Sequence, residues 1–345
     1  MQPDPLPLTP NPKESPMSLV LTSAEVMQIL DMDLALAAAR EAFRAYGEGR
    51  VNMPPKAYLT LAKGDFRAMY GEIFLESGHV CGLKWVNVHP ENPQRGLLTV
   101  MAKIVLNDPE TGLEWADMDG TYITNFRTGA AGGVAAEVLS RPDAKSLGVI
   151  GAGEQARTQI AAIIKVRPIE EVIICDCAHH RAQALRQEVE ALYKITTRLE
   201  PTPKETAMAA DILVTATPSA IPLVERDWVK PGIHINAIGA DAAGKQELDP
   251  DILQVAKIVV DDWAQASHSG EINVPLSRGE LTPKQVYGSL GEVVADKKPG
   301  RENAEEITVF DSTGLVIQDL SLGFAVYLGA KERGLGEMKE FLKVT

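Results

Sequence analysis

The sequence predicts an α/β protein with a doubly wound parallel sheet and, in a second domain, a mixed sheet. From residue 146 onward, short apolar runs alternate with helical stretches, which is typical of parallel strands joined by helices. Between residues 56 and 107, strand-like segments instead follow one another across short turns, which favours antiparallel pairing. A chain of 345 residues is also long enough for two domains.

The expected elements follow these patterns along the chain. A helix with apolar spacing covers 32–46 and stops at Gly47 and Gly49, while Ser23 is expected to cap the helical segment before it. Strands are expected at 56–61, 66–70, 79–88, 99–107, 146–150, 172–175, 196–200, 212–216, 233–237, 258–261 and 307–310. Further helices are expected at 122–139, 154–166, 178–193 and 315–330. The first of these is rich in alanine and glycine and is expected to connect the two domains.

The composition narrows the class of protein. A net charge of −13 argues against nonspecific nucleic-acid binding, and no apolar run reaches the roughly 20 residues that span a bilayer. The proline-rich residues 1–17 are expected to form a disordered tail rather than a targeting segment. Cys81, Cys175 and Cys177 are expected to be buried thiols in a reducing cytoplasm, and no histidine spacing predicts a metal site.

The most informative segment lies between residues 146 and 176. A buried strand is followed by Gly151, Gly153 and Ala156 in a G-x-G-x-x-A motif, then by a helix and a second strand that ends at Asp176. Gly151 permits a tight turn, Gly153 lets the backbone approach a pyrophosphate, and the helix N-terminus favours the phosphate charge. The alternative is an ordinary tight turn without a ligand. The full strand–helix–strand context favours a dinucleotide-binding Rossmann domain.

Asp176 decides which dinucleotide is expected. A carboxylate at this position can accept hydrogen bonds from the ribose hydroxyls and repels a 2′-phosphate, so NAD is favoured over NADP. Arg181 follows closely in the sequence and leaves NADP open. His179 and His180 are expected to be solvated residues at the start of a helix, and His268 and Glu271 to lie in a solvated loop.

Three charged residues could take part in chemistry. A partly buried Lys84 would have a lowered pKa and could polarise a carbonyl or imine, although the strand alternation fits an exposed lysine equally well. Arg127, at the start of an Ala/Gly-rich helix, could hold a carboxylate, or could be a surface arginine. Asp241 follows the strand 233–237 at a sheet edge where ligands bind, and its alternative role is to cap the next turn.

Long segments of the chain resemble the ornithine cyclodeaminase/μ-crystallin family, and within it the archaeal-type alanine dehydrogenases. The segments that carry the resemblance are MPPKAYL (53–59), GDFRAM (64–69), GLKWVNVHPENPQRGLLTV (82–100), DGTYITNFRTGAAGG (119–133), GAGEQA (151–156), HINAIGADAAGKQELD (234–249), DDWAQASHSGEIN (261–273) and EEITVFDSTGLVIQDL (305–320). The resemblance implies a substrate-binding and dimerisation domain at 18–125 and 315–345, and a Rossmann NAD-binding domain at 126–314. It also implies a homodimer.

The resemblance assigns roles to particular residues. It implies that Lys84 and Asp241 are catalytic, and that the substrate is bound by Lys56, Arg67, Lys84 and Arg127. The residues implied at the cofactor are Thr99, Arg127, Gly151, Gly153, Glu154, Gln155, Asp176, Thr217, Pro218, Asp241, Lys245 and Ser312. In the cyclodeaminases of the family an acid replaces Arg67 and can pair with the distal amine of ornithine. An arginine at this position therefore favours the dehydrogenase members.

The resemblance implies an NAD-dependent dehydrogenase that interconverts a small L-amino acid, first of all L-alanine, and its 2-keto acid plus ammonia. Hydride would pass from the α-carbon to NAD, and water activated by Asp241 would add to the resulting iminium while Lys84 stabilises the oxygen. Three alternatives remain open: an ornithine cyclodeaminase, a reductase of cyclic ketimines such as pyrroline-2-carboxylate, and a μ-crystallin-like binding protein. In each case the expected partner is a small molecule rather than a nucleic acid or a membrane.

Overall fold

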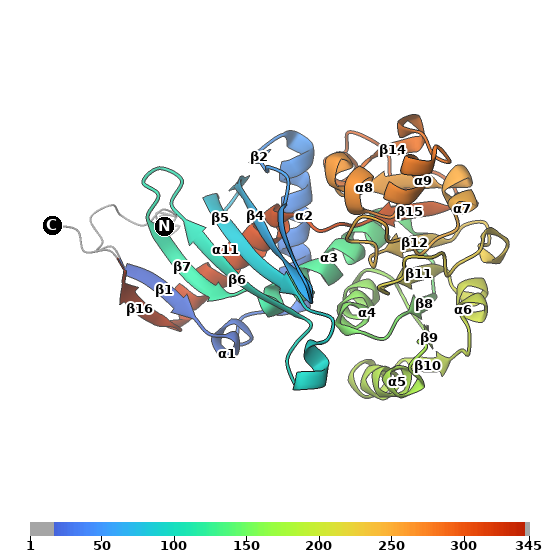
Figure 1. Ribbon diagram of the computed structural model, residues 1–345, viewed down its shortest axis with the longest axis horizontal. Coiled ribbons are helices and arrows are strands. Elements are labelled where there is room, and N and C mark those ends of the chain that lie inside the picture. Colours follow the sequence, from blue (N-terminus) through green and yellow to red (C-terminus); the bar gives the residue numbers. More distant parts are fainter. Residues whose placement is uncertain (1–16, 342–345) are drawn as a thin grey trace, which may run out of the picture. The chain divides into compact units, whose positions relative to one another are not determined.

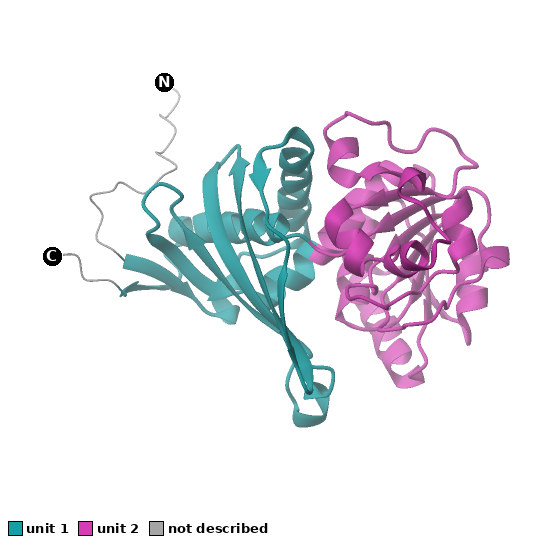
Figure 2. Cartoon of the chain, turned by 45° about the horizontal axis from the view of Figure 1, so that its top comes forward, with its two compact units in different colours: residues 1–127, 315–345 teal, residues 128–314 magenta. Residues whose placement is uncertain are grey.

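The computed structural model describes residues 17–341 and divides into two compact units. The first unit consists of residues 1–127 and 315–345, and the second of residues 128–314, as coloured in Figure 2. The division falls within helix α3 (Thr121–Leu139). Residues 1–16 of the expected N-terminal tail lie outside the described part of the chain.

The first unit is a mixed sheet with helices against one face (Figure 1). Its strands are β1 (Met17–Leu21), β2 (Val51–Asn52), β3 (Ala57–Leu61), β4 (Gly64–Leu75), β5 (Gly78–Val88), β6 (Val100–Asn107), β7 (Glu114–Asp119) and β16 (Glu337–Glu340). They run in the order β16-β1-β7-β6-β5-β4-β2, with β3 paired to β4. Only β1 and β7 pair in parallel; the other pairs are antiparallel. The expected mixed sheet is therefore present.

Helices α2 (Met32–Glu48) and α11 (Val316–Arg333) pack on each other and on β4, and α11 also packs on β5 and β6. The Asp31 side chain accepts a hydrogen bond from Leu34 N at the start of α2, and Gly49 ends the helix with a left-handed φ of 75°. The short α1 (Ser23–Val26) is capped by Thr22 rather than by the expected Ser23, because the Thr22 side chain binds Glu25 N. A 3-10 turn, η1 (Asn92–Arg95), joins β5 to β6.

Four strands of this unit were not expected from the sequence. β1, β2, β7 and β16 have only two to six residues each, and segments of this length give a weak strand pattern. Met17, expected in the tail, begins β1 and pairs with Glu340 of β16. Pairing with distant strands, rather than the local pattern, thus determines the structure at this edge.

The second unit is a parallel sheet with helices on its faces, as predicted. Its strands are β8 (Ser146–Ile150), β9 (Glu171–Cys175), β10 (Thr196–Leu199), β11 (Ile212–Thr215), β12 (His234–Ala237), β13 (Lys257–Val260), β14 (Val286–Ser289) and β15 (Thr308–Asp311). They run in the order β10-β9-β8-β11-β12-β15-β13-β14, and every neighbouring pair is parallel. The order reverses between β8 and β11, which is where ligands bind in such sheets.

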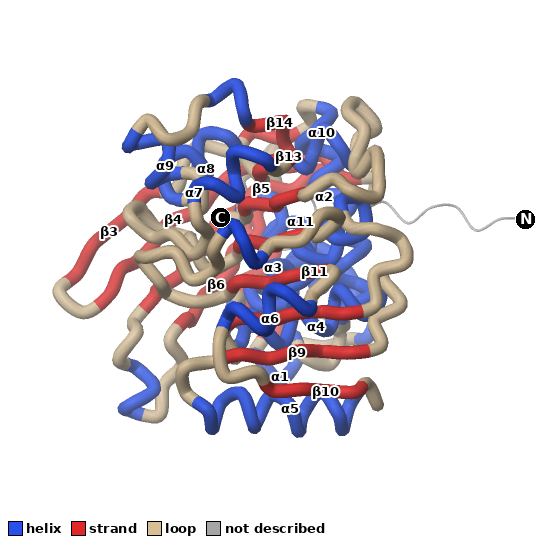
Figure 3. The backbone as a smooth tube through the Cα atoms, turned by 90° about the vertical axis from the view of Figure 1, so that its right-hand side faces the viewer, coloured by secondary structure: helices blue, strands red, loops and turns tan. Residues whose placement is uncertain are grey.

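Helices and short turns connect these strands. They are α4 (Glu154–Val166), α5 (His179–Tyr193), α6 (Pro203–Ala209), α7 (Pro250–Val255), α8 (Trp263–Ser269), α9 (Asn273–Arg278) and α10 (Leu290–Val294), with the 3-10 turns η2 (Arg226–Trp228) and η3 (Pro283–Gln285). Figure 3 shows β9 and β10 side by side with α5 running along them. Two apolar clusters of buried side chains, one around Val149 and Ile160 and one around Ile235 and Val309, form the core.

Within residues 17–341, no helix combines the length and apolarity needed to cross a bilayer. In the same range, His, Cys, Asp and Glu side chains nowhere gather in threes in a way that could hold a metal ion.

Candidate functional site

The glycine motif of the second unit forms the turn from β8 into α4. Gly151 has a φ of +97°, and an added Cβ would lie 2.6 Å from Ala216 O, so the backbone requires glycine there. Gly153 is the N-cap of α4 and is exposed, and an added Cβ would meet no atom within 4 Å. The space over Gly153 is therefore open to a ligand, as a pyrophosphate site requires. Ala156 is fully buried where α4 packs on the sheet.

Asp176 follows β9 and lies beside this turn. Its Oδ2 accepts a hydrogen bond from Ala152 N at 2.7 Å, and its Oδ1 accepts one from Ala178 N at 2.7 Å. The carboxylate is thus fixed next to the glycine loop, on the strand after the first helix, where a ribose would be bound. The turn, the helix N-terminus and the carboxylate together fit a dinucleotide.

The other residues predicted at the cofactor in this unit follow neighbouring strands or open α4. Thr217 and Pro218 follow β11, and Ser312 follows β15. Glu154 and Gln155 form the first turn of α4, and the exposed Glu154 lies 3.6 Å from Arg157. Because the carboxyl ends of parallel strands share one edge, the sheet brings these loops to the same edge as the glycine turn.

Asp241 lies four residues beyond β12, in the same set of loops. Lys245 Nζ donates a hydrogen bond to Asp241 Oδ1 at 2.6 Å, and both side chains are roughly one-third exposed, at 27% and 31%. The two residues predicted as catalytic base and cofactor-proximal lysine therefore form an ion pair that solvent reaches.

In the first unit, Lys84 of β5 is buried. The alternative that the sequence pattern allowed, a lysine exposed to solvent, is therefore excluded. Its Nζ lies 2.7 Å from Oδ2 of Asp319 on α11, whose side chain is 0% exposed. Burial, followed by the positive charges of Arg127 and Lys56, lowers the pKa of Lys84 to about 7, while Asp319 opposes this shift. An amine with this pKa can both hold and release a proton near neutral pH.

The same carboxylate binds a second cation. Arg127 Nε donates to Asp319 Oδ1 at 3.0 Å, and Arg127 Nη1 donates to Gln318 Oε1 at 3.0 Å. One buried carboxylate thus binds two buried basic side chains, and when Lys84 is protonated the cluster carries an excess positive charge that suits an anionic ligand. Asp319 and Gln318 were missed from the sequence, where the one signal is a polar pair inside an otherwise apolar helix.

Glycines in the sheet allow α11 to approach this cluster. An added Cβ at Gly82, two residues before Lys84 on the same face of β5, would lie 2.8 Å from Leu320 Cδ2. Leu320 follows Asp319 directly, so the missing side chain at Gly82 lets α11 lie close to the strand that carries Lys84. The position of Asp319 therefore depends on a glycine in the facing strand.

Arg67 and Lys56 complete the set of cations. In the pairing of β4 with β5, Lys84 lies opposite Met69, and Val86 lies opposite Arg67. Arg67 and Lys84 are therefore diagonal neighbours on one face of the sheet. Arg67 Nε donates to Asp65 Oδ1 at 2.7 Å, and its guanidinium lies over the Tyr58 ring at 5.5 Å. The structure thus brings together the four predicted substrate-binding cations, Lys56, Arg67, Lys84 and Arg127.

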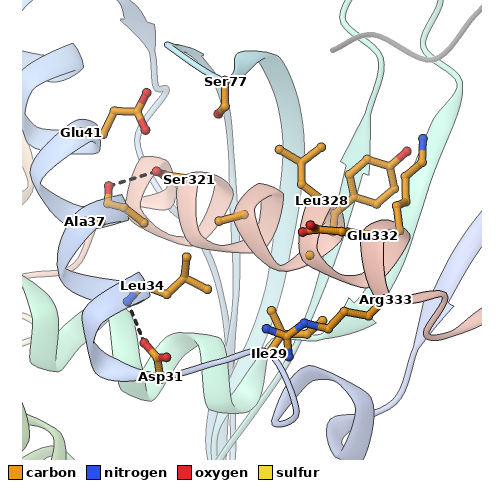
Figure 4. Close-up of a pocket in the computed structure, with 15 residues that line it drawn as sticks. Ile29, Asp31, Leu34, Ala37, Glu41, Ser77, Ser321, Leu328, Glu332 and Arg333 are labelled. Carbon is orange, nitrogen blue, oxygen red and sulfur yellow. Dashed lines mark hydrogen bonds between the residues drawn. The ribbon is translucent and has the colours of Figure 1, made fainter. Parts of the chain in front are cut away.

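Two features of the first unit lie apart from this cluster. Thr99, predicted at the cofactor phosphates, precedes β6, where its carbonyl accepts a hydrogen bond from His89 N. A pocket of about 910 Å³ lies beside α2 and α11 and is lined by Leu34, Glu41 and Leu328 among others (Figure 4). None of the predicted site residues lines it, so this pocket does not coincide with the candidate site.

Two expectations about single residues were wrong. Cys177 is exposed and Cys81 half-buried, whereas only Cys175 is buried, because Cys177 lies beyond the end of β9. Glu271, expected in a solvated loop, is completely buried, and its carboxylate accepts hydrogen bonds from Glu247 N and Leu248 N. Burial and the charge of Glu247 raise the pKa of Glu271 well above its usual range.

Sequence comparison assigns the chain to a family. The profile of the ornithine cyclodeaminase/mu-crystallin family matches residues 17–334. The chain belongs to this family. Alanine dehydrogenase of Archaeoglobus fulgidus is 48% identical over 327 residues, which cover 95% of this chain and 99% of that protein. The resemblance seen in the sequence is therefore confirmed.

Solved structures agree with the fold. An archaeal alanine dehydrogenase dimer with bound NAD has a TM-score of 0.91 at 48% identity, covering 94% of this chain and 100% of that one. Pyrroline-2-carboxylate reductase of Thermococcus litoralis, solved with NADH and L-proline, has a TM-score of 0.89 at 35% identity, covering 92% of this chain and 99% of that one. The predicted fold class is confirmed.

The two glycines of the motif should respond differently to alanine. Gly151→Ala should lower the melting temperature, because the φ is left-handed and the new Cβ would clash with Ala216 O. Gly153→Ala should leave the melting temperature unchanged but weaken NADH binding, because its Cβ enters the open space over the turn. Differential scanning fluorimetry and NADH titration check both variants. Equal NADH affinity in Gly153→Ala and wild type would contradict the assignment of this turn to the dinucleotide.

The lowered pKa of Lys84 predicts a pH-dependent stability. Between pH about 7 and about 10, the unfolded chain keeps a proton on this lysine that the folded chain has lost, so the free energy of unfolding rises with pH. Lys84→Met should remove this contribution, which is at most about 1.4 kcal/mol per pH unit. Urea unfolding at several pH values measures the difference. Lys63→Met, at a lysine whose side chain is 63% exposed, is the control and should follow wild type.

Proposed function

We propose that this protein interconverts a small L-amino acid, with L-alanine as the first candidate, and its 2-keto acid plus ammonia. The chain is an NAD-dependent oxidoreductase of its family, in keeping with its glycine turn and Asp176 and with relatives solved with NAD or NADH. The observation that carries the proposal is the buried pairing of Lys84 and Arg127 with Asp319. When Lys84 is protonated, this pairing leaves a net positive charge that suits the carboxylate shared by amino and keto acids.

The residues of the first unit would bind and orient the substrate. Arg127, with Lys56 and Arg67, would hold the carboxylate, and the planar guanidinium of Arg127 suits a two-point contact. Lys84, with a pKa of about 7, would donate a hydrogen bond or a proton to the oxygen or nitrogen on the α-carbon. NAD, when bound, supplies the hydride acceptor at that carbon.

Asp241 would act as the general base of the second unit. Its ion pair with Lys245 keeps the carboxylate oriented, and its partial exposure gives access to water. A carboxylate that accepts a proton from water would allow hydrolysis of the oxidised amino acid to the keto acid. The same residue would return the proton during reductive amination.

Arg67 argues against ornithine as substrate. Its guanidinium is buried and bound to Asp65, so its position is fixed. A second amine on the substrate would meet a cation instead of an acid at this position, and like charges repel in a buried site. A dehydrogenase that acts on amino acids with small, uncharged side chains is therefore favoured over a cyclodeaminase.

A second candidate function is the reduction of a cyclic ketimine. The pyrroline-2-carboxylate reductase structure contains L-proline and is 35% identical to this chain. Its substrate also carries a carboxylate next to a carbon–nitrogen double bond, so the same cations could bind it. The two functions differ in their need for ammonia, because a ketimine already contains its nitrogen.

NADH absorbance separates these functions. Oxidation of NADH with pyruvate should require ammonium, and NAD should be reduced with L-alanine. Oxidation with pyrroline-2-carboxylate but not with pyruvate and ammonium would establish the ketimine reductase instead. Release of ammonia from L-ornithine without net change of NADH would indicate the cyclodeaminase.

Lys84→Ala and Asp241→Ala should each lower kcat roughly 100-fold or more, because each removes a group that handles a proton. NADH binding, measured by fluorescence, should survive in both variants. Lys63→Ala, at an exposed lysine of the same unit, is the control and should keep wild-type kcat. Wild-type turnover in either site variant would refute the catalytic role proposed for that residue.

We also propose that the protein is a homodimer and that the open face of the first sheet forms the interface. Helices cover the other face, while Tyr70, Phe74 and Trp85 on neighbouring strands are 45%, 44% and 41% exposed. A sheet face that exposes several large aromatic side chains favours association, and the archaeal alanine dehydrogenase is described as a dimer.

Trp85→Glu should convert the protein to a monomer, because it removes a large apolar side chain from the interface and adds a charge there that would have to lose its water. Light scattering after size-exclusion chromatography measures the mass. Trp263→Glu is a matched control, since this tryptophan on α8 is 40% exposed but lies in the other unit. An unchanged dimer in Trp85→Glu would place the interface elsewhere.

A further inference from the structure

Four buried carboxylates link the loops at the carboxyl edge of the parallel sheet. Asp261 accepts from Thr313 N and Gly314 N, and Asp311 accepts from Glu271 N and Ile272 N. Glu271 in turn accepts from Glu247 N and Leu248 N. Each side chain therefore binds peptide groups of another loop, and Glu247 is the last member of the series.

Glu247 joins the loops that follow β11 and β12. Its Oε1 accepts hydrogen bonds from Thr217 N at 2.8 Å and Thr217 Oγ1 at 2.7 Å. Its Oε2 accepts one from Gly239 N at 2.9 Å. The two oxygens of one carboxylate thus bind two loops that neighbouring parallel strands carry.

The two loops pack closely at this junction. An added Cβ at Gly239 would lie 2.2 Å from Thr217 O and 2.5 Å from Glu247 Oε2. Asp241 N then donates to Gly239 O at 3.1 Å, so the peptide that Glu247 binds leads directly to Asp241. The positions of Thr217 and of Asp241 therefore depend on one buried side chain.

The hydrogen bonds at this junction require an acid rather than an amide. In the described part of the chain, no lysine, arginine or histidine lies within 4.0 Å of the Glu247 carboxylate. Burial raises the pKa of Glu247, which shows that the fold bears a cost to keep this group. A carboxylate offers two acceptor oxygens, whereas a glutamine offers one acceptor and one donor that no amide N–H can bind.

We propose that Glu247 is a positioning residue, which holds the Thr217 loop and the Asp241 loop at the spacing that NAD binding requires. It acts through these two loops. The inference deepens the proposed function, because it depends on the second unit binding NAD but not on which amino acid is the substrate.

NADH titration of Glu247→Gln tests the proposal. The variant keeps the size of the side chain but loses one acceptor, so one loop should be released and the Kd for NADH should rise at least about tenfold. Asp211→Asn is the matched control. Asp211 lies at the opposite end of β11, where it accepts from Lys145 N and Ser146 N, so its loss should lower the melting temperature without changing the Kd for NADH.

A lower melting temperature with a Kd within about twofold of wild type in Glu247→Gln would overturn the proposal. If that variant does not fold, Glu247→Asp, which is too short to reach both loops, is measured in its place with the same expected rise in Kd. NADH binding by the wild-type protein does not require an amino-acid substrate. If the wild-type protein binds NADH but turns over no amino or imino acid, the proposed reaction is wrong. The role of Glu247 in NADH binding can still be measured in that case.

Discussion

The ion pair between Lys84 and Asp319 is the interaction on which the candidate substrate site depends. A lysine without a counter-charge at this depth would lose its proton, and a carboxylate without one would be more costly still. Asp319 compensates Lys84 and Arg127 together, so that one negative charge serves two cations. The remaining positive charge is what an anionic substrate would neutralise. Burial and the neighbouring cations, rather than any property of lysine itself, bring the pKa of Lys84 to about 7.

The second unit also contains buried carboxylates, but they have a different role. There, buried carboxylates bind peptide N–H groups rather than cations, and they join loops that the parallel sheet delivers to one edge. Burial raises the pKa of Asp311 to about 8 and that of Glu271 well above its usual range. Burial makes the charged form of these acids costly, and the peptide N–H groups that they bind offset part of this cost.

The sequence predicts features that depend on neighbouring residues and misses those that depend on distant ones. The turn at Gly151, the strand 146–150 and the helix to Val166 follow from local patterns and are present as expected. Asp319 is 192 residues from Arg127 along the chain, and no local pattern connects them. Glu271 was misplaced for the same reason, because its partners at Glu247 and Leu248 lie in another loop. Strands β1 and β16 likewise form through pairing with distant segments, since β1 pairs with both β16 and β7.

The division of charge between the two units explains why one family can hold several reactions. In the first unit, the proposed function has the cations bind a carboxylate and polarise the group on the adjacent carbon, which would suit a keto acid, an imine or an amino acid alike. In the second unit, the glycine turn and Asp176 suit a dinucleotide whatever the substrate. Specificity must then come from residues that meet the rest of the substrate. Arg67, buried and bound to Asp65, would contribute to specificity under the proposed function, because a cation at this position would repel a substrate with a second amine.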